Sequence, residues 1–175
     1  MAQDGFASLT LHDTEPPTSA PAKSEWRALS LSAPWWWLML HLPPEHRKNI
    51  ENRPPKFSHK SFRGEFLLHA AKSGSKEDFQ AATTCAEFYG VPAELLRTMP
   101  SIGTISRGGI VGRARITDML NPDPESCAFW HFPKQLGFVV EDAQPLPFVE
   151  CRGSLGFWKV PESVIGELRE KGAQL

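Results

Sequence analysis

The sequence predicts one α+β domain built on a small, strongly bent sheet or barrel with flanking helices. Short segments typical of strands alternate with a few segments of helical periodicity, which is the pattern of this class. The chain has 175 residues, of which 41% are hydrophobic and 22% are charged. These proportions suit a globular protein with a single core, so we exclude a fibrous or wholly disordered chain.

The first elements of the domain are an alternating strand and a tryptophan-rich helix. Apolar and polar side chains alternate over residues 28–32, as in a half-buried strand. Pro34 then suits the first turn of a helix over 35–41. Successive helical residues point about 100° apart, so at least one of the three consecutive tryptophans should reach a surface or cleft. A short extended segment follows over 49–53 and ends at a proline pair.

Two helices are predicted between the next strands. Residues 64–71 are apolar on both faces, which favours a central strand. Apolar side chains recur every three or four residues over 76–89, which predicts an amphipathic helix ending at Gly90. Pro92 opens a shorter helix that reaches about Met99.

The C-terminal part of the domain is predicted to contain two strands and a final helix. Residues 110–120 alternate as a strand should, and one face should carry Ile110, Gly112, Ala114 and Ile116. A second strand is predicted over 136–140, and a polar stretch broken by prolines leads from it to residues 153–160. Residues 162–171 should form the terminal helix with their apolar side chains on its inner side.

Residues 1–25 are predicted to be a disordered acidic leader, which leaves residues 26–175 as the domain. The leader has three prolines among Thr, Ser and Ala, and one lysine against four carboxylates. Its first residues lack the basic and apolar segments of a secretory signal. The longest apolar run, over 33–40, has 8 residues, whereas a membrane-spanning helix needs roughly 20. We therefore expect a cytoplasmic protein without a membrane span.

The cysteine and histidine patterns do not predict a metal site. Cys85, Cys127 and Cys151 are too far apart for a Cys-x-x-Cys knuckle, and their odd number does not suit a disulfide framework. The histidines have no ligand spacing, and no glycine-rich nucleotide motif follows a strand. We expect no metal and no cofactor.

A basic block is hidden in the near-neutral total charge. The formal net charge is −1, but residues 46–72 contain seven Lys and Arg against two Glu, a local balance of +5. Each Lys or Arg that contacts a phosphate releases condensed counterions, and nearby aromatic rings can stack on bases. The block therefore indicates nucleic-acid binding, while a solvated loop beside core aromatics is an equally good explanation from composition alone.

The most specific arrangement in this block is Lys48-x-x-Glu51-x-Arg53. In an extended segment Glu51 and Arg53 lie on one face, two residues apart, and Lys48 bounds the same pocket. A carboxylate between two cations can accept a hydrogen bond from the amino edge of a base, or form an acid and base pair with Lys48. The alternative is a structural ion pair at a sheet edge.

Five motifs in order resemble the ASCH (activating signal cointegrator homology) domain of the PUA-like superfamily. They are LSLSAPW at 29–35, the motif Lys48-x-x-Glu51-x-Arg53, the segment 63–72, the segment 109–120, and the ending from 138–140 through Gly153 to 157–158. The resemblance covers about residues 28–160. It implies a PUA-like β-barrel of about five to six strands with flanking helices. It also implies a cleft that receives Lys48, Glu51 and Arg53, with Lys72 at the end of the adjacent strand.

The resemblance implies binding to RNA or DNA, since related domains bind these polymers. As a binding domain, the protein would take RNA, single-stranded DNA or a modified base. Phosphates and base edges would contact Lys48, Arg53, Arg63 and Lys72, an amino group would contact Glu51, and Trp35 or Trp37 would offer a stacking face. His69 would lie beside the cleft, either as a proton carrier or as a hydrogen-bonded histidine of the barrel.

The resemblance also leaves an enzymatic function open. Some similar proteins hydrolyse acylated cytidine or are associated with RNA cleavage. The chain would then be a ribonuclease or an amidohydrolase acting on a modified nucleoside such as N4-acylcytidine, with Lys48 and Glu51 as acid and base. Those hydrolases resemble this chain at the lysine but use a hydroxyl residue where Glu51 stands, which favours binding. A module whose basic face binds an acidic protein is a third hypothesis.

Overall fold

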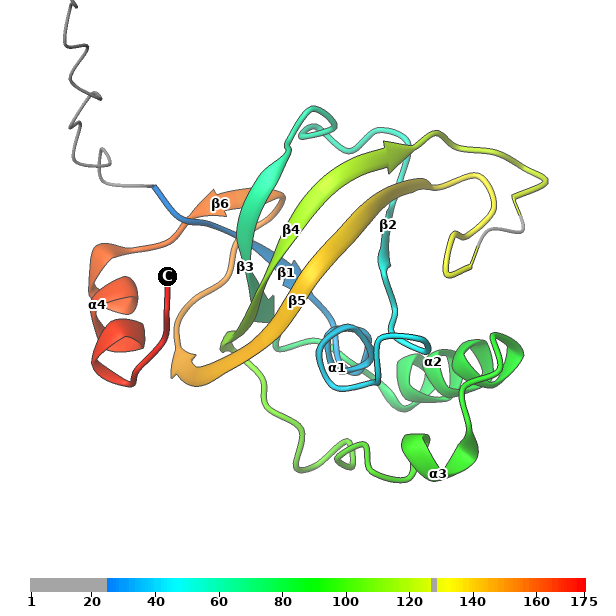
Figure 1. Ribbon diagram of the computed structural model, residues 1–175, viewed down its shortest axis with the longest axis horizontal. Coiled ribbons are helices and arrows are strands. Elements are labelled where there is room, and N and C mark those ends of the chain that lie inside the picture. Colours follow the sequence, from blue (N-terminus) through cyan, green and yellow to red (C-terminus); the bar gives the residue numbers. More distant parts are fainter. Residues whose placement is uncertain (1–24, 127–128) are drawn as a thin grey trace, which may run out of the picture.

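The computed structural model describes residues 25–126 and 129–175, in which six strands form one curled sheet with four helices around it (Figure 1). The strands are β1 (Arg27–Leu31), β2 (Ile50–Arg53), β3 (Gly64–Ala70), β4 (Gly109–Leu120), β5 (Leu136–Glu150) and β6 (Phe157–Lys159). The helices are α1 (Trp35–Leu40), α2 (Lys76–Phe88), α3 (Ala93–Leu96) and α4 (Glu162–Glu170). The predicted α+β class, with a strongly bent sheet and flanking helices, is confirmed.

The sheet curls into a half-barrel that strand pairing does not close. Its strand order is β2-β5-β4-β3-β1-β6, with β1 parallel to β3 and the other neighbours antiparallel. Within the described residues, the end strands β2 and β6 do not pair with each other. Strand β6 pairs with β1 up to Leu29, so Ser30 and Leu31 have no strand neighbour on that side in the described chain. Side chains must therefore connect the two ends of the sheet.

Most of the predicted leader, residues 1–24, lies outside the described residues, as does Cys127. Glu25, the last residue of the predicted leader, is described and forms an exposed ion pair with Lys159 of β6. Among the described helices, none combines the length and apolarity that crossing a bilayer requires.

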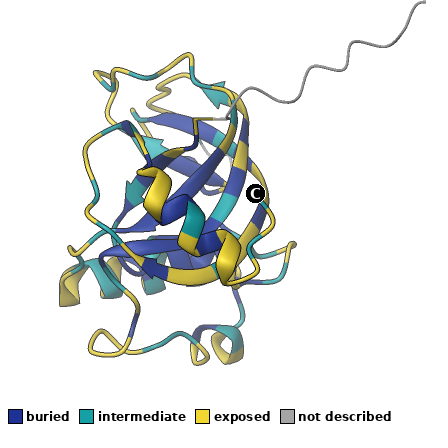
Figure 2. Ribbon diagram, turned by 90° about the vertical axis from the view of Figure 1, so that its left-hand side faces the viewer, coloured by how far each residue is buried: buried dark blue, intermediate teal, exposed yellow. Residues whose placement is uncertain are grey.

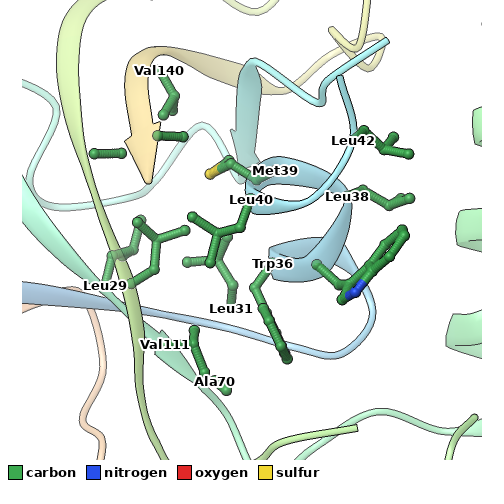
Figure 3. Close-up of a cluster of buried hydrophobic side chains, with 14 of the residues drawn as sticks. Leu29, Leu31, Trp36, Leu38, Met39, Leu40, Leu42, Ala70, Val111 and Val140 are labelled. Atoms are coloured by element: carbon green, nitrogen blue, oxygen red, sulfur yellow. The ribbon is translucent and has the colours of Figure 1, made fainter. Parts of the chain in front are cut away.

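The main core lies between α1 and the sheet. Leu40 of α1 points toward Leu29 and Leu31 of β1 (Figure 3), and all three side chains are at most 2% exposed. Gly112 of β4 leaves the space that Leu40 occupies, because a Cβ at this position would lie 2.6 Å from Leu40 Cδ1 and 2.8 Å from Gln144 O. Helix α1 therefore packs closely against the sheet at Gly112, where β4 has no side chain.

A second, smaller core covers the opposite face of the sheet under α4. Val164, Ile165 and Leu168 are buried there, as the helical periodicity predicts, together with Ala28 and Leu67. The exposed residues of α4 face away from the buried strands (Figure 2). This helix therefore closes the side of the sheet that α1 leaves open.

The prediction that Ile110 shares a face with Gly112, Ala114 and Ile116 is wrong. Ile110 belongs to the smaller core, whereas Ala114 and Ile116 belong to the main core. The pairing with β3 steps from His69–Ile110 to Leu68–Gly112, so β4 carries one extra residue between these pairs. Such a β-bulge reverses the alternation of side chains along the strand, which local periodicity alone does not reveal.

The second C-terminal strand is also longer than the sequence predicts. Strand β5 continues beyond residue 140 to Glu150, through Pro145 and Pro147. Its pairing with β2 ends at Val139, so the rest of β5 pairs with β4 and has a free edge in the described chain. Proline is tolerated at a free edge because its missing amide hydrogen costs no ladder hydrogen bond there.

The predicted helices are present with small changes at their ends. Helix α2 starts at a capping box, in which Ser75 Oγ accepts from Asp78 N at 3.2 Å and Asp78 Oδ2 accepts from Ser75 N at 2.8 Å. These two hydrogen bonds satisfy donors that the first helical turn leaves without partners. Helix α3 is shorter than predicted and ends at Leu96 rather than near Met99.

Two glycine substitutions test the close approach of α1 to β4. Gly112→Ala should lower the free energy of unfolding by about 1–3 kcal/mol, because its Cβ would overlap Leu40 and the backbone of β5. Gly166→Ala in α4, where a Cβ meets nothing within 4 Å, should raise this free energy by about 0.5–1 kcal/mol. Urea denaturation measures both changes. Equal effects of the two substitutions would contradict the proposed role of Gly112.

Candidate functional site

A pocket of about 250 Å³ lies where β2 faces the free end of β1. Its lining comes from three parts of the chain: Ser30, Leu31, Ser32 and Trp35 around the end of β1, Lys48, Glu51, Asn52 and Arg53 around β2, and Phe132 and Gln135. Lys48, Glu51 and Arg53, the three residues of the signature, all border this one pocket.

Glu51 lies between the two cations of the signature. Its Oε2 accepts a hydrogen bond from Lys48 Nζ at 2.7 Å, and its Oε1 lies 3.0 Å from Arg53 Nη2. The side chains of Lys48 and Glu51 are 2% and 10% exposed. The network is therefore not an exposed ion pair of the kind found at sheet edges, which contributes only about 0–1 kcal/mol to stability.

Arg53 also connects the two ends of the sheet. Its Nη2 donates to Ser30 O at 2.8 Å, and its guanidinium carbon lies 5.5 Å from the centre of the Phe57 ring. Phe57 in turn contacts Phe138 of β5 and Phe157 of β6, with ring centroids 5.7 Å and 6.2 Å apart. One polar contact and one aromatic cluster therefore replace the strand pairing that would close a barrel.

The carboxyl group of Glu51 stays ionised in spite of its burial. Burial alone would raise its pKa, but the charges of Lys48 and Arg53, with their hydrogen bonds, hold the pKa below its ordinary value. Glu51 is therefore a fixed, negatively charged hydrogen-bond acceptor at neutral pH.

One of the three consecutive tryptophans reaches the pocket, as the helical geometry predicts. Trp36 and Trp37 are 4% and 5% exposed, whereas Trp35 is half-buried and lines the pocket. The Trp35 ring meets Phe132 edge-on, with ring centroids 5.8 Å apart. Trp37 instead stacks on His41, at 5.5 Å between centroids, and belongs to the main core. Of the two predicted stacking candidates, Trp35 is the one that borders the pocket.

Asn52 fastens a distant loop to the pocket. Its Nδ2 donates to Trp130 O and its Oδ1 accepts from Phe132 N, both at 2.8 Å. Within this loop, the buried His131 donates through Nε2 to Gln135 O at 2.8 Å. These hydrogen bonds hold Phe132 and Gln135 at the pocket wall.

His69 and Lys72 line a second pocket of about 740 Å³. His69 Nε2 lies 3.2 Å from Cys151 O, which can only accept, so Nε2 carries the proton. His69 Nδ1 lies 3.1 Å from Ser30 Oγ, whose hydroxyl group donates to Ser154 O at 3.1 Å. Burial lowers the pKa of His69, although the hydrogen bond to Cys151 O opposes this shift, so the ring is neutral at pH 7. Ser30 lines both pockets.

The basic block does not form one continuous site. Arg47 donates to Leu42 O at 3.1 Å and Ala143 O at 3.0 Å, which holds the residues after α1 against β5. Arg63 donates to the carbonyl groups of Lys60 and Phe62, lies 3.7 Å from Asp118 Oδ1, and borders neither of the two pockets described above.

Sequence reasoning missed six residues of the smaller pocket: Ser30, Leu31, Ser32, Asn52, Phe132 and Gln135. Asn52 could have been predicted from the sequence, because it is an amide that stands between two signature residues in an extended segment. Phe132 had no local signal, since it is 80 positions from Asn52 and reaches the pocket through tertiary hydrogen bonding.

Comparison of the chain with known protein families and with curated proteins found no match. In residues 25–126 and 129–175, no group of three His, Cys, Asp or Glu side chains is placed to hold a metal ion.

Removing the charge of Glu51 should strongly destabilise the fold. Glu51→Gln leaves the buried Lys48 and the partly buried Arg53 without their counter-charge, and removing one partner of a buried pair typically costs about 3–5 kcal/mol. Glu65→Gln is the matched control, because Glu65 is 46% exposed and its contacts with Arg113 and Arg115 are 4.0 Å and 3.8 Å long. The control should change the free energy of unfolding by less than about 0.5 kcal/mol. Urea denaturation at neutral pH measures both.

The ionised state of Glu51 should also make part of the stability depend on pH. Because the folded pKa lies below the ordinary value of 4.5, this contribution is complete above pH 4.5 and is lost as the pH falls through the folded pKa. The difference in unfolding free energy between the wild-type protein and Glu51→Gln should therefore shrink steadily below pH 4.5. A difference that stays constant down to pH 3, within about 0.5 kcal/mol, would contradict this assignment.

Proposed function

We propose that the protein binds single-stranded nucleic acid and receives one base in the pocket between β1 and β2. The observation that carries this proposal is a buried, ionised carboxylate, held by two cations, in the same pocket of about 250 Å³ as a half-buried tryptophan. The volume is below the range of drug-sized ligand sites, about 300–1,000 Å³, and suits one base rather than a longer segment. A base in single-stranded nucleic acid is free to leave the stack and enter such a site.

Each pocket residue has a role that follows from its chemistry. Glu51 accepts a hydrogen bond from the exocyclic amino group of a cytosine or adenine. Trp35 offers a ring face on which the base stacks. The side chain of Arg53 is 21% exposed and lines the pocket, so its guanidinium group can donate to a base oxygen or a phosphate.

The resemblance to the ASCH domain supports the same function. The curled six-stranded sheet with flanking helices is compatible with the small PUA-like barrel that this resemblance implies. Under this proposal the signature Lys48-x-x-Glu51-x-Arg53 forms the base-reading end of a nucleic-acid cleft, and the ligand is RNA or single-stranded DNA.

The alternative is a ribonuclease or an amidohydrolase of a modified nucleoside, with Lys48 and Glu51 as acid and base. A general base works best when its pKa lies near the working pH. The pKa of Glu51 is instead lowered, and both of its oxygens already face a cation within 3.0 Å. These features suit a fixed acceptor better than a proton carrier, so we favour binding.

Binding of short RNA and DNA oligonucleotides tests the proposal. Affinity should fall as salt rises, and Trp35→Ala should weaken binding about 5- to 150-fold, which corresponds to the loss of one stacked base, about 1–3 kcal/mol. Lys60→Ala is the control, because Lys60 is exposed in the same basic block and does not border the pocket. Fluorescence anisotropy measures the affinities. Absence of binding at low salt, or equal effects of the two substitutions, would overturn the proposal.

Product analysis separates binding from catalysis. The protein is incubated with RNA and with N4-acetylcytidine, beside the Glu51→Gln variant. The binding function predicts no turnover of either compound. Products that form with the wild-type protein would support the enzymatic alternative, and their loss in a Glu51→Gln variant that circular dichroism shows to be folded would assign the reaction to this carboxylate.

A further inference from the structure

The larger pocket carries two cations without counter-charges. Lys72 and Arg152 both line it and are exposed, and neither side chain has an ion pair or hydrogen bond within residues 25–126 and 129–175. The side chain of Lys72 lies across Gly108, where a Cβ would come within 2.9 Å of Lys72 Cε. The absence of a side chain at Gly108 thus leaves room for the lysine stem along the pocket wall.

The other ionisable groups of this pocket leave it with a positive charge. Glu150 is the one carboxylate in the lining, and His69 is neutral. Two cations and one carboxylate give a net charge of +1 at pH 7. A site of this kind favours an anion that can approach Lys72 and Arg152 while it stays clear of Glu150.

The two pockets meet at one residue of β1. The hydroxyl group of Ser30 lies 3.1 Å from His69 Nδ1 in the larger pocket, and its carbonyl oxygen accepts from Arg53 in the smaller pocket. Ser30 lies beyond the residues that pair with β6, so no strand covers this edge of β1 in the described chain. The two pockets therefore share Ser30 as a common wall residue.

We propose that Lys72 and Arg152 bind the phosphodiester backbone next to the base that occupies the smaller pocket. The ligand is then an oligonucleotide that spans both pockets rather than a free nucleoside. Arg152 offers a planar set of donors that matches phosphate oxygens, and Lys72 adds a point charge. This inference rests on the proposed function and deepens it, because it assigns backbone contacts to one pocket and base contacts to the other.

The test compares cytidine with a short oligocytidylate, as RNA and as DNA, on the full chain. The double variant Lys72→Ala/Arg152→Ala should bind cytidine as the wild-type protein does, because a nucleoside has no phosphate. Its affinity for both oligonucleotides should fall, and the slope of log K against log salt should become shallower by about 1.4, or about 0.7 for each lost contact with a single strand. Glu150→Gln should tighten oligonucleotide binding, since it removes the repelling carboxylate.

The matched control is Lys76→Ala/Arg97→Ala, which removes two exposed cations that border neither pocket. This control should leave the slope unchanged. Suppose that the wild-type protein binds the oligonucleotides and that both double variants reduce the slope of log K against log salt equally. The backbone assignment is then overturned, while the proposed function stands. If the wild-type protein binds no oligonucleotide, both the proposed function and this assignment fail.

Discussion

The rest of the structure depends on a buried carboxylate held between two cations. The ends of the sheet, β2 and β6, do not pair within the described residues, so hydrogen bonding along strands does not close the half-barrel. Arg53 links the gap by contacting both Glu51 and Ser30 O. Its position requires the negative charge of Glu51, and that charge requires Lys48 in turn, because an unpaired buried ion is very costly. The connection between the two ends of the sheet and the charges of the smaller pocket therefore depend on the same three side chains.

Local irregularities of the sheet make this arrangement possible. The extra residue in β4 turns Ile110 toward α4 and Gly112 toward α1, so each face of the sheet receives the helix that it can accommodate. The prolines of β5 stand where the strand has a free edge, which lets the strand continue without a partner on that side. Bulges and edge prolines of this kind re-aim side chains and end pairing. The edge of β1 beside the site is open for a different reason, because β6 pairs with β1 only up to Leu29.

In our proposal, the two pockets divide the tasks that recognition of a nucleic acid requires. The smaller pocket contains a fixed acceptor, which can distinguish bases that carry an amino group, and an aromatic ring on which any base can stack. The larger pocket is lined by two cations without ion-pair partners in the described chain, which can bind the phosphate backbone of a nucleic acid whatever its sequence. Ser30 lies between them and touches residues of both, so β1 is the boundary between base and backbone contacts in our proposal.

The sequence by itself determined the features that depend on neighbouring residues. Alternation placed Glu51 and Arg53 on one face, and helical geometry required one of three tryptophans to leave the core. Tertiary structure decided the rest, because it depends on contacts between residues far apart in the chain. Hydrogen bonds from Asn52 bring Phe132 to the pocket, although 80 positions separate the two residues. Strand register likewise decided which core Ile110 joins, since one extra residue reverses every side chain beyond it.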